Sequence, residues 1–158
     1  MTIKKLLIAN RGEIASRIIS SSHDMGISCV AIYTEADKET PYVREADQAF
    51  KLSDSYLNSK EILDIALKSN SDAIHPGYGF LSENAAFANQ VKKLNIKWVG
   101  PSSNAIKKMG DKLTAKEIAI KANVPTLPMT SDPKKANSIG YPILVKAAAG
   151  GGGKGMRI

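Results

Sequence analysis

Apolar residues follow two alternating spacings along this chain, and together they predict strands separated by helices. Short apolar runs typical of buried strands fall at 5–9, 27–33, 73–75 and 97–99, with a weaker run at 49–52. Between these runs, apolar residues at helical spacing predict helices over 14–25, 59–69 and 84–94. Strands that alternate with helices of this length are typical of a parallel sheet with right-handed crossovers. We therefore expect an α/β fold that begins with a Rossmann-like domain.

The pattern changes near residue 110. A helix is predicted over 116–122, with Thr114 and Glu117 as a capping box. Prolines among polar residues at 124–139 are typical of a linker. An apolar run at 142–145 predicts a further strand, and residues 156–158 predict the start of a returning one. The expected parts are a Rossmann-like domain at 1–110, a helical linker at 111–139 and a glycine-rich hairpin at 140–158.

Four consecutive glycines, Gly150–Gly153, lie inside this hairpin. Without side chains, their backbone N–H groups can approach an anion closely, and Lys146 and Lys154 supply positive charge on either side. A Walker A loop does not fit, because Gly155 rather than Ser or Thr follows Lys154. A disordered glycine linker is the alternative. The preceding strand and the two lysines favour a lid over the phosphates of a nucleotide.

A second distinctive segment, residues 75–84, reads HPGYGFLSEN. It follows a predicted strand and precedes a predicted helix, so we expect it at the carboxyl edge of the sheet, where α/β proteins place ligands. Gly77 and Gly79 permit tight turns, and Tyr78 offers an aromatic face with a polar tip. Glu83 suits the start of a helix. From this chemistry alone, a structural loop is as reasonable as a ligand-binding one.

The first turn, residues 8–15, reads IANRGEIA and excludes one common function of this fold. Dinucleotide binding requires G-x-G-x-x-G directly after the first strand. This turn offers only Gly12, between Arg11 and Glu13, so a pyrophosphate would meet bulky side chains. We do not expect NAD or FAD to bind here.

Residues 8–15, 75–84, 110–112 and 141–158 together resemble biotin carboxylases, the ATP-dependent component of biotin-dependent carboxylases. Residues 141–158 resemble the start of an ATP-grasp lid. The resemblance implies the amino-terminal part of an enzyme that uses MgATP and bicarbonate to carboxylate carrier-bound biotin. It implies that the lid is truncated here and that the Mg²⁺ ligands and the catalytic residues lie downstream, so the isolated chain is expected to be inactive.

The resemblance also assigns roles to individual residues. It places Tyr78 beside biotin and makes its neighbours supporting loop residues, namely His75, Gly77, Gly79 and Glu83. It assigns ATP contacts to two lysines and to the glycine-rich loop, namely Lys112, Lys146, Gly150, Gly151, Gly152, Gly153, Lys154 and Gly155. The implied partners are a biotin carboxyl carrier protein or domain, a carboxyltransferase subunit or domain, and a second copy in a homodimer.

Composition indicates the kind of partner and the cellular compartment. The net charge of +7 favours anionic partners, here phosphates rather than nucleic acid, because the lysines are scattered and aromatic residues are only 6% of the chain. No apolar run approaches the roughly 20 residues that span a bilayer. We expect no membrane contact and no leader peptide, and the single cysteine, Cys29, suits a reducing cytoplasm.

Two alternatives remain open. One is another ATP-grasp ligase, such as a carbamoyl-phosphate synthetase or an amine–carboxylate ligase of purine synthesis. The loop at 75–84 argues against it, because those enzymes use no biotin. The other is a non-catalytic Rossmann-like module.

Overall fold

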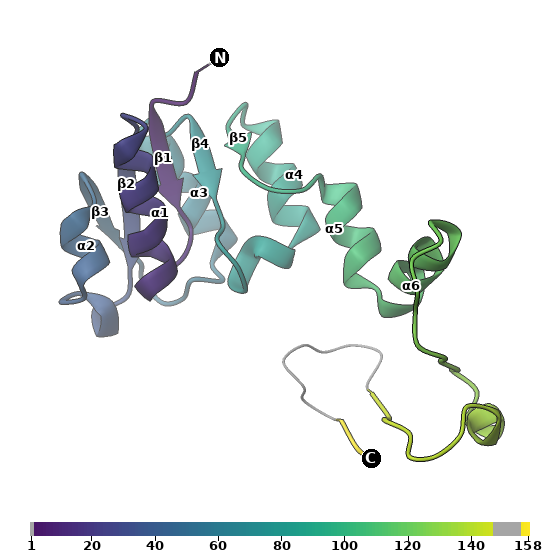
Figure 1. Ribbon diagram of the computed structural model, residues 1–158. Coiled ribbons are helices and arrows are strands. Elements are labelled where there is room, and N and C mark those ends of the chain that lie inside the picture. The colour runs from purple at the N-terminus through teal and green to yellow at the C-terminus, as the bar shows by residue number, and fades with distance from the viewer. Residues whose placement is uncertain (1, 147–155) are drawn as a thin grey trace. The chain divides into compact units, whose positions relative to one another are not determined.

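The computed structural model describes residues 2–146 and 156–158 (Figure 1). The chain divides into two compact units, Met1–Lys107 and Lys108–Ile158. Strands of the first unit form one sheet: β1 (Lys5–Ile8), β2 (Ser28–Tyr33), β3 (Gln48–Lys51), β4 (Ala73–His75) and β5 (Lys97–Trp98). The order across this sheet is β3-β2-β1-β4-β5, and every neighbouring pair is parallel. This is the strand order of a Rossmann-like fold, so the predicted fold class is confirmed.

Four helices cover the two faces of the sheet (Figure 1). They are α1 (Gly12–Asp24), α2 (Pro41–Glu45), α3 (Ser59–Lys68) and α4 (Ala85–Lys93). Leu6 and Ile8 of β1 pack with residues of α1 and α2, whereas Leu7 and Ala9 pack with residues of α3 and α4. Both faces of the strand are therefore buried, which explains its continuous apolar run. Full burial of each leucine or isoleucine contributes about 1.5–3 kcal/mol.

The predicted strands and helices of this unit are all present, with bounds within two residues of those expected. The sequence pattern missed α2 and the 3₁₀ turns at Glu35–Asp37 and Phe80–Glu83. These elements are too short to show a helical period. The only local signal was Pro41, which suits the first turn of a helix.

The second unit contains less regular structure among its described residues. Helix α5 (Ser103–Gly110) contains the boundary between the units, and α6 (Lys112–Lys121) and a 3₁₀ turn at Pro133–Ser138 follow. The two strands predicted at 142–145 and 156–158 are represented by one antiparallel bridge. In it, Val145 and Arg157 exchange N–H···O bonds of 2.7 and 3.0 Å.

The start of α6 corrects the predicted capping box. The helix begins at Lys112 rather than Lys116, and the Asp111 side chain accepts a 2.7 Å hydrogen bond from the Thr114 N–H. Thr114 therefore lies in the first turn and is not the cap. The prediction was wrong because two residues with oxygen-bearing side chains competed for one role, and the earlier one, Asp111, fulfils it. Among the described helices, none is long and apolar enough to cross a membrane.

Candidate functional site

The sheet brings together two turns that are far apart in the sequence. Ile8 pairs with His75 in register, and the Ala9 N–H donates a 2.8 Å hydrogen bond to the His75 carbonyl. Both strands end at this point, so the turn after β1 and the loop after β4 leave the same carboxyl edge. The segment 75–84 therefore begins at the carboxyl edge of the sheet, as its position after a predicted strand indicated.

Asn10 joins these two turns. Its side chain is almost fully buried, and its amide nitrogen donates to the carbonyls of Pro76 and Tyr78 at 2.7 and 2.9 Å. Its amide oxygen accepts the Arg11 N–H at 2.9 Å. A buried amide with these partners fixes the backbone on both sides of Gly77. Sequence reasoning missed this role, because an asparagine in a turn usually contacts only its own backbone.

Gly77 has no room for a side chain. Its φ is +63°, and a Cβ there would lie 2.5 Å from the Asn10 amide nitrogen. We expect Gly77→Ala to lower the free energy of unfolding by about 2–3 kcal/mol, combining left-handed strain of about 1 kcal/mol with displacement of Asn10. The matched control is Gly26→Ala, since Gly26 has a φ of +70° and open space around it. Urea titrations that gave equal losses for both variants would show that the Asn10 contact is unimportant.

The loop leaves Tyr78 and Phe80 accessible, and their exposed fractions are 65% and 43%. His75 at its start is half-buried, and its Nδ1 accepts the Gly77 N–H at 3.0 Å. Burial, with a smaller contribution from Arg17, lowers the pKa of His75, which keeps the imidazole neutral as that acceptor. Glu83 is exposed at the end of the loop. A rigid backbone thus presents an accessible aromatic side chain.

A buried carboxylate supports the same edge. Asp37 is 3% exposed, and it accepts hydrogen bonds from the Arg11 Nε and the Tyr56 hydroxyl, both at 2.6 Å. A second Arg11 nitrogen contacts the other carboxylate oxygen, so the pair is bidentate. The Tyr56 hydroxyl also contacts the Tyr42 hydroxyl at 2.9 Å and accepts the Thr34 N–H at 3.1 Å. The Arg11 hydrogen bond, assisted by Tyr56, lowers the pKa of Asp37 despite its burial.

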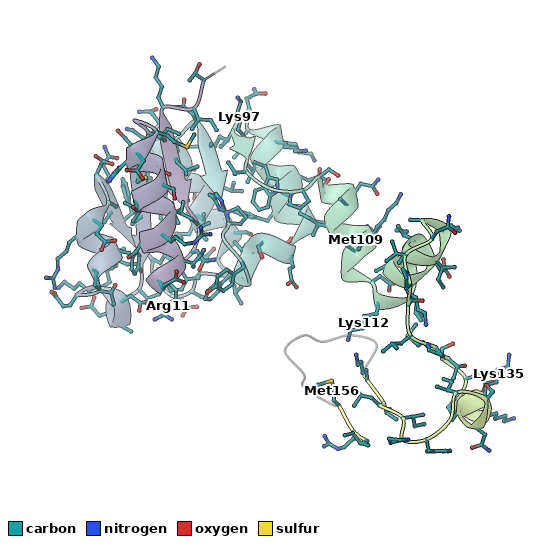
Figure 2. All side chains as sticks on the ribbon, in the orientation of Figure 1. Arg11, Lys97, Met109, Lys112, Lys135 and Met156 are labelled. Carbon is teal, nitrogen blue, oxygen red and sulfur yellow. The ribbon has the colours of Figure 1, made fainter. Side chains whose placement is uncertain are left out.

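This network reaches the loop through aromatic contacts. The Tyr56 ring lies 5.4 Å from the Phe80 ring, and the Arg11 guanidinium lies 5.9 Å from the Tyr56 ring centre. Figure 2 labels Arg11 at this carboxyl edge and Lys97, the first residue of β5, at the other end of the first unit. No sequence pattern predicts this network, since Asp37 stands in a polar stretch that predicts exposure.

The predicted nucleotide-binding residues belong to the second unit. Lys112 is the exposed first residue of α6, directly after the Asp111 cap (Figure 2). Lys146 is also exposed and follows the bridge at Val145. The remaining predicted contacts, Gly150–Gly153, Lys154 and Gly155, lie outside the described residues.

Comparison with known proteins gives two matching family models. Residues 2–106 match "Biotin carboxylase, N-terminal domain", and residues 111–158 match "Carbamoyl-phosphate synthase L chain, ATP binding domain". The first match covers more than half of the chain. The chain belongs to the biotin carboxylase family.

Individual members of the biotin carboxylase family agree with this assignment. Biotin carboxylase 1 of Bacillus subtilis is 50% identical over 169 residues, a match that covers 99% of this chain and 38% of that protein. The biotin carboxylase domain of Hydrogenobacter thermophilus 2-oxoglutarate carboxylase is 44% identical, with a TM-score of 0.93 over 99% of this chain and 37% of that one. A biotin carboxylase from Campylobacter jejuni gives a TM-score of 0.92 at 44% identity, over 99% and 38%. The chain thus spans less than two fifths of the length of these relatives.

The predicted resemblance to biotin carboxylases is confirmed. The alternative of a carbamoyl-phosphate synthetase-like ligase has support only in residues 111–158, where the ATP-binding model matches. Residues 2–106 match the biotin carboxylase model instead, and they contain both the turn at Asn10 and residues 75–84, which we call the Tyr78 loop. The part of the chain that could distinguish the two families therefore favours biotin carboxylase.

Proposed function

We propose that this chain supplies the biotin-side loop and part of the phosphate-binding surface of an enzyme that uses MgATP and bicarbonate to carboxylate carrier-bound biotin. The observation that carries this proposal is the Tyr78 loop. Its backbone is held at the carboxyl edge by the buried Asn10 amide, while the Tyr78 side chain stays 65% exposed. An accessible aromatic ring on a rigid loop suits contact with the flat ureido ring of biotin.

The second unit offers groups that fit a nucleotide's phosphates. Lys112 is an exposed lysine in the first turn of a ten-residue helix, directly after the Asp111 cap, and its ammonium acts as a point charge for phosphate. Lys146 adds an exposed ammonium, which acts as a compact charge for phosphate. The Hydrogenobacter domain was solved with MgADP, ADP and bicarbonate. When bound, MgATP supplies the phosphoryl group that activates bicarbonate, and the role of these lysines is to neutralise and orient its phosphates. We assign no Mg²⁺ ligand to the described residues.

The second unit exposes apolar side chains, and the proposal includes the protein surface that would cover them. Among the described residues 108–146 and 156–158 none is buried. Several large apolar side chains there are exposed, including Leu113, Ile120, Val124 and Leu127. A unit without a buried core needs cover from other protein surface. In our proposal that cover comes from the part of the biotin carboxylases that this chain does not span, and the partners are a biotin carrier, a carboxyltransferase and a second copy, in the cytoplasm.

Tyr78 provides the test of the biotin assignment. The assay uses a chimera in which this chain replaces the matching part of Bacillus subtilis biotin carboxylase 1. We expect Tyr78→Ala to raise the KM for free biotin about tenfold, because loss of an aromatic contact costs roughly 1–1.5 kcal/mol, with little change in the KM for ATP. Met25→Ala, which removes another exposed apolar side chain, serves as the control. An unchanged KM for biotin in the Tyr78 variant would remove the biotin role of this loop.

A further inference from the structure

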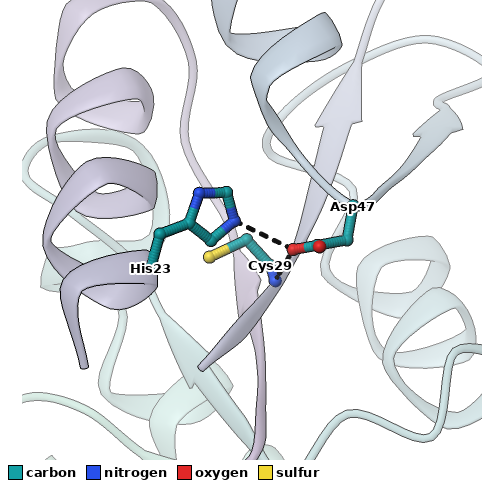
Figure 3. Close-up of side chains that lie close together, drawn as sticks. All are labelled: His23, Cys29 and Asp47. Atoms are coloured by element: carbon teal, nitrogen blue, oxygen red, sulfur yellow. Dashed lines mark hydrogen bonds and ion pairs between the residues drawn. The ribbon is translucent and has the colours of Figure 1, made fainter. Parts of the chain in front are cut away.

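Three side chains with metal-binding atoms meet at the amino edge of the sheet (Figure 3). The Tyr78 loop leaves the opposite, carboxyl edge. His23 lies in the last turn of α1, Cys29 is the second residue of β2, and Asp47 directly precedes β3. Their nitrogen, sulfur and oxygen atoms all lie within 4.8 Å of one another. The three residues come from three separate parts of the chain, so their proximity is set by the fold and not by sequence spacing along one helix.

The spacing of the His23 and Asp47 ligand atoms suits a small cation. The His23 Nε2 lies 3.0 Å from the Asp47 Oδ2. Two ligand atoms bonded to one tetrahedral zinc at ~2.0–2.1 Å lie ~3.3 Å apart, close to this separation. Figure 3 shows the Cys29 sulfur and the imidazole together on the same side of the strand. The set combines imidazole, thiol and carboxylate, which are the ligand types that Zn²⁺ takes in proteins.

The three side chains differ in burial, and the difference leaves one coordination position of a bound ion open to solvent. The Cys29 residue is fully buried, whereas the His23 and Asp47 side chains are 42% and 47% exposed. The Cys29 backbone N–H donates to the Asp47 Oδ2 at 2.7 Å, which holds the carboxylate beside the thiol before any ion arrives. A cation held here would contact water on its outer side.

We propose that His23, Cys29 and Asp47 form a binding site for one Zn²⁺ ion, with water as the fourth ligand. Binding replaces the thiol proton with the metal, and that proton leaves to the solvent. Burial raises the pKa of the Cys29 thiol, so the proton is present at neutral pH, and metal affinity rises with pH. The ion would tie the end of α1 to the starts of β2 and β3. The site lies in the first unit and does not depend on the nucleotide or biotin assignments.

Cobalt provides a spectroscopic probe of this site, because Co²⁺ accepts the same ligands. Titrating the 158-residue chain with Co²⁺ under reducing conditions should give a thiolate charge-transfer band that saturates at one ion per chain. Zn²⁺ should displace the cobalt and raise the midpoint of thermal unfolding. Interpretation is simple because the chain has one cysteine, and its other histidine, His75, lies at the opposite edge of the sheet.

Variants separate the site from incidental binding. We expect Cys29→Ser to abolish the charge-transfer band, and His23→Gln and Asp47→Asn each to weaken Co²⁺ binding at least tenfold. Asn at position 47 keeps an acceptor for the Cys29 N–H, and Asp24→Asn removes an exposed neighbouring acid as the control. His23→Gln changes an exposed side chain, so its result stands even if the Cys29 variant unfolds. A missing band, or wild-type affinity in His23→Gln, would show that His23 and Asp47 form only an ion pair.

Discussion

Replacing Asp37 with alanine is expected to lower the free energy of unfolding by about 3 kcal/mol. The change leaves the Arg11 guanidinium and the Tyr56 hydroxyl without their shared acceptor, and removing one member of a buried ion pair costs about 3–5 kcal/mol. The lower end applies because the Arg11 side chain is 46% exposed and can be hydrated. Urea unfolding of the 158-residue chain measures the loss.

Asp64→Ala is the matched control, since Asp64 is an exposed acid of α3 in the same unit. Its stability change should stay within about 0.5 kcal/mol. Equal changes in the two variants would show that the Asp37 network contributes nothing beyond an ordinary surface carboxylate.

The Asp37 network and His75 each give a pH dependence with a definite sign. The pKa of Asp37 is lower in the folded chain than in the unfolded one, so its contribution is full above the unfolded value of about 3.9 and is lost as the pH falls through the folded value. The pKa of His75 is also lowered, so the folded state begins to lose stability once the pH falls below about 6.5. Stability should therefore fall with acid in two stages. Because the pKa values of Asp47, Asp72 and Asp111 are also lowered, Asp37→Asn should reduce the more acidic stage only in part, and it should leave the His75 stage unchanged.

Replacing Lys112 or Lys146 with glutamine is expected to weaken ATP binding about ten- to a hundredfold in the chimera with Bacillus subtilis biotin carboxylase 1. Each change removes a charge-assisted contact worth roughly 1.5–3 kcal/mol. Lys121→Gln is the control, because Lys121 is exposed at the other end of α6 and has no predicted role. Calorimetric titration with a non-hydrolysable ATP analogue measures the affinities. If both variants bound it as tightly as the unchanged chimera, neither lysine would contact the phosphates.

The Rossmann-like domain could be predicted because its signals are local and repeated. The run Leu6–Ala9 is apolar without interruption, which both faces of a buried parallel strand require. The position of the Tyr78 loop followed from the same logic, since a segment after a strand must leave at the carboxyl edge. The match of residues 2–106 to the biotin carboxylase model then confirmed the family.

The contacts that hold the loop could not be predicted in this way. The bond from Asn10 to the Pro76 carbonyl joins residues 66 positions apart, and it depends on the register of β1 with β4. Asp37 is buried only because Arg11 and Tyr56 reach it from other elements. Long-range polar contacts produce no periodic pattern in a sequence. A polar stretch therefore predicts an exposed surface even where one of its carboxylates is buried.

Bicarbonate-dependent ATP cleavage, measured with and without free biotin, bears most directly on the proposed function. We expect the chimera to release phosphate in a reaction that requires bicarbonate and accelerates with biotin. The isolated 158-residue chain should show no release above background. Turnover by the isolated chain, or release from the chimera that is indifferent to both bicarbonate and biotin, would contradict the proposal that this chain contributes to a biotin carboxylase active site.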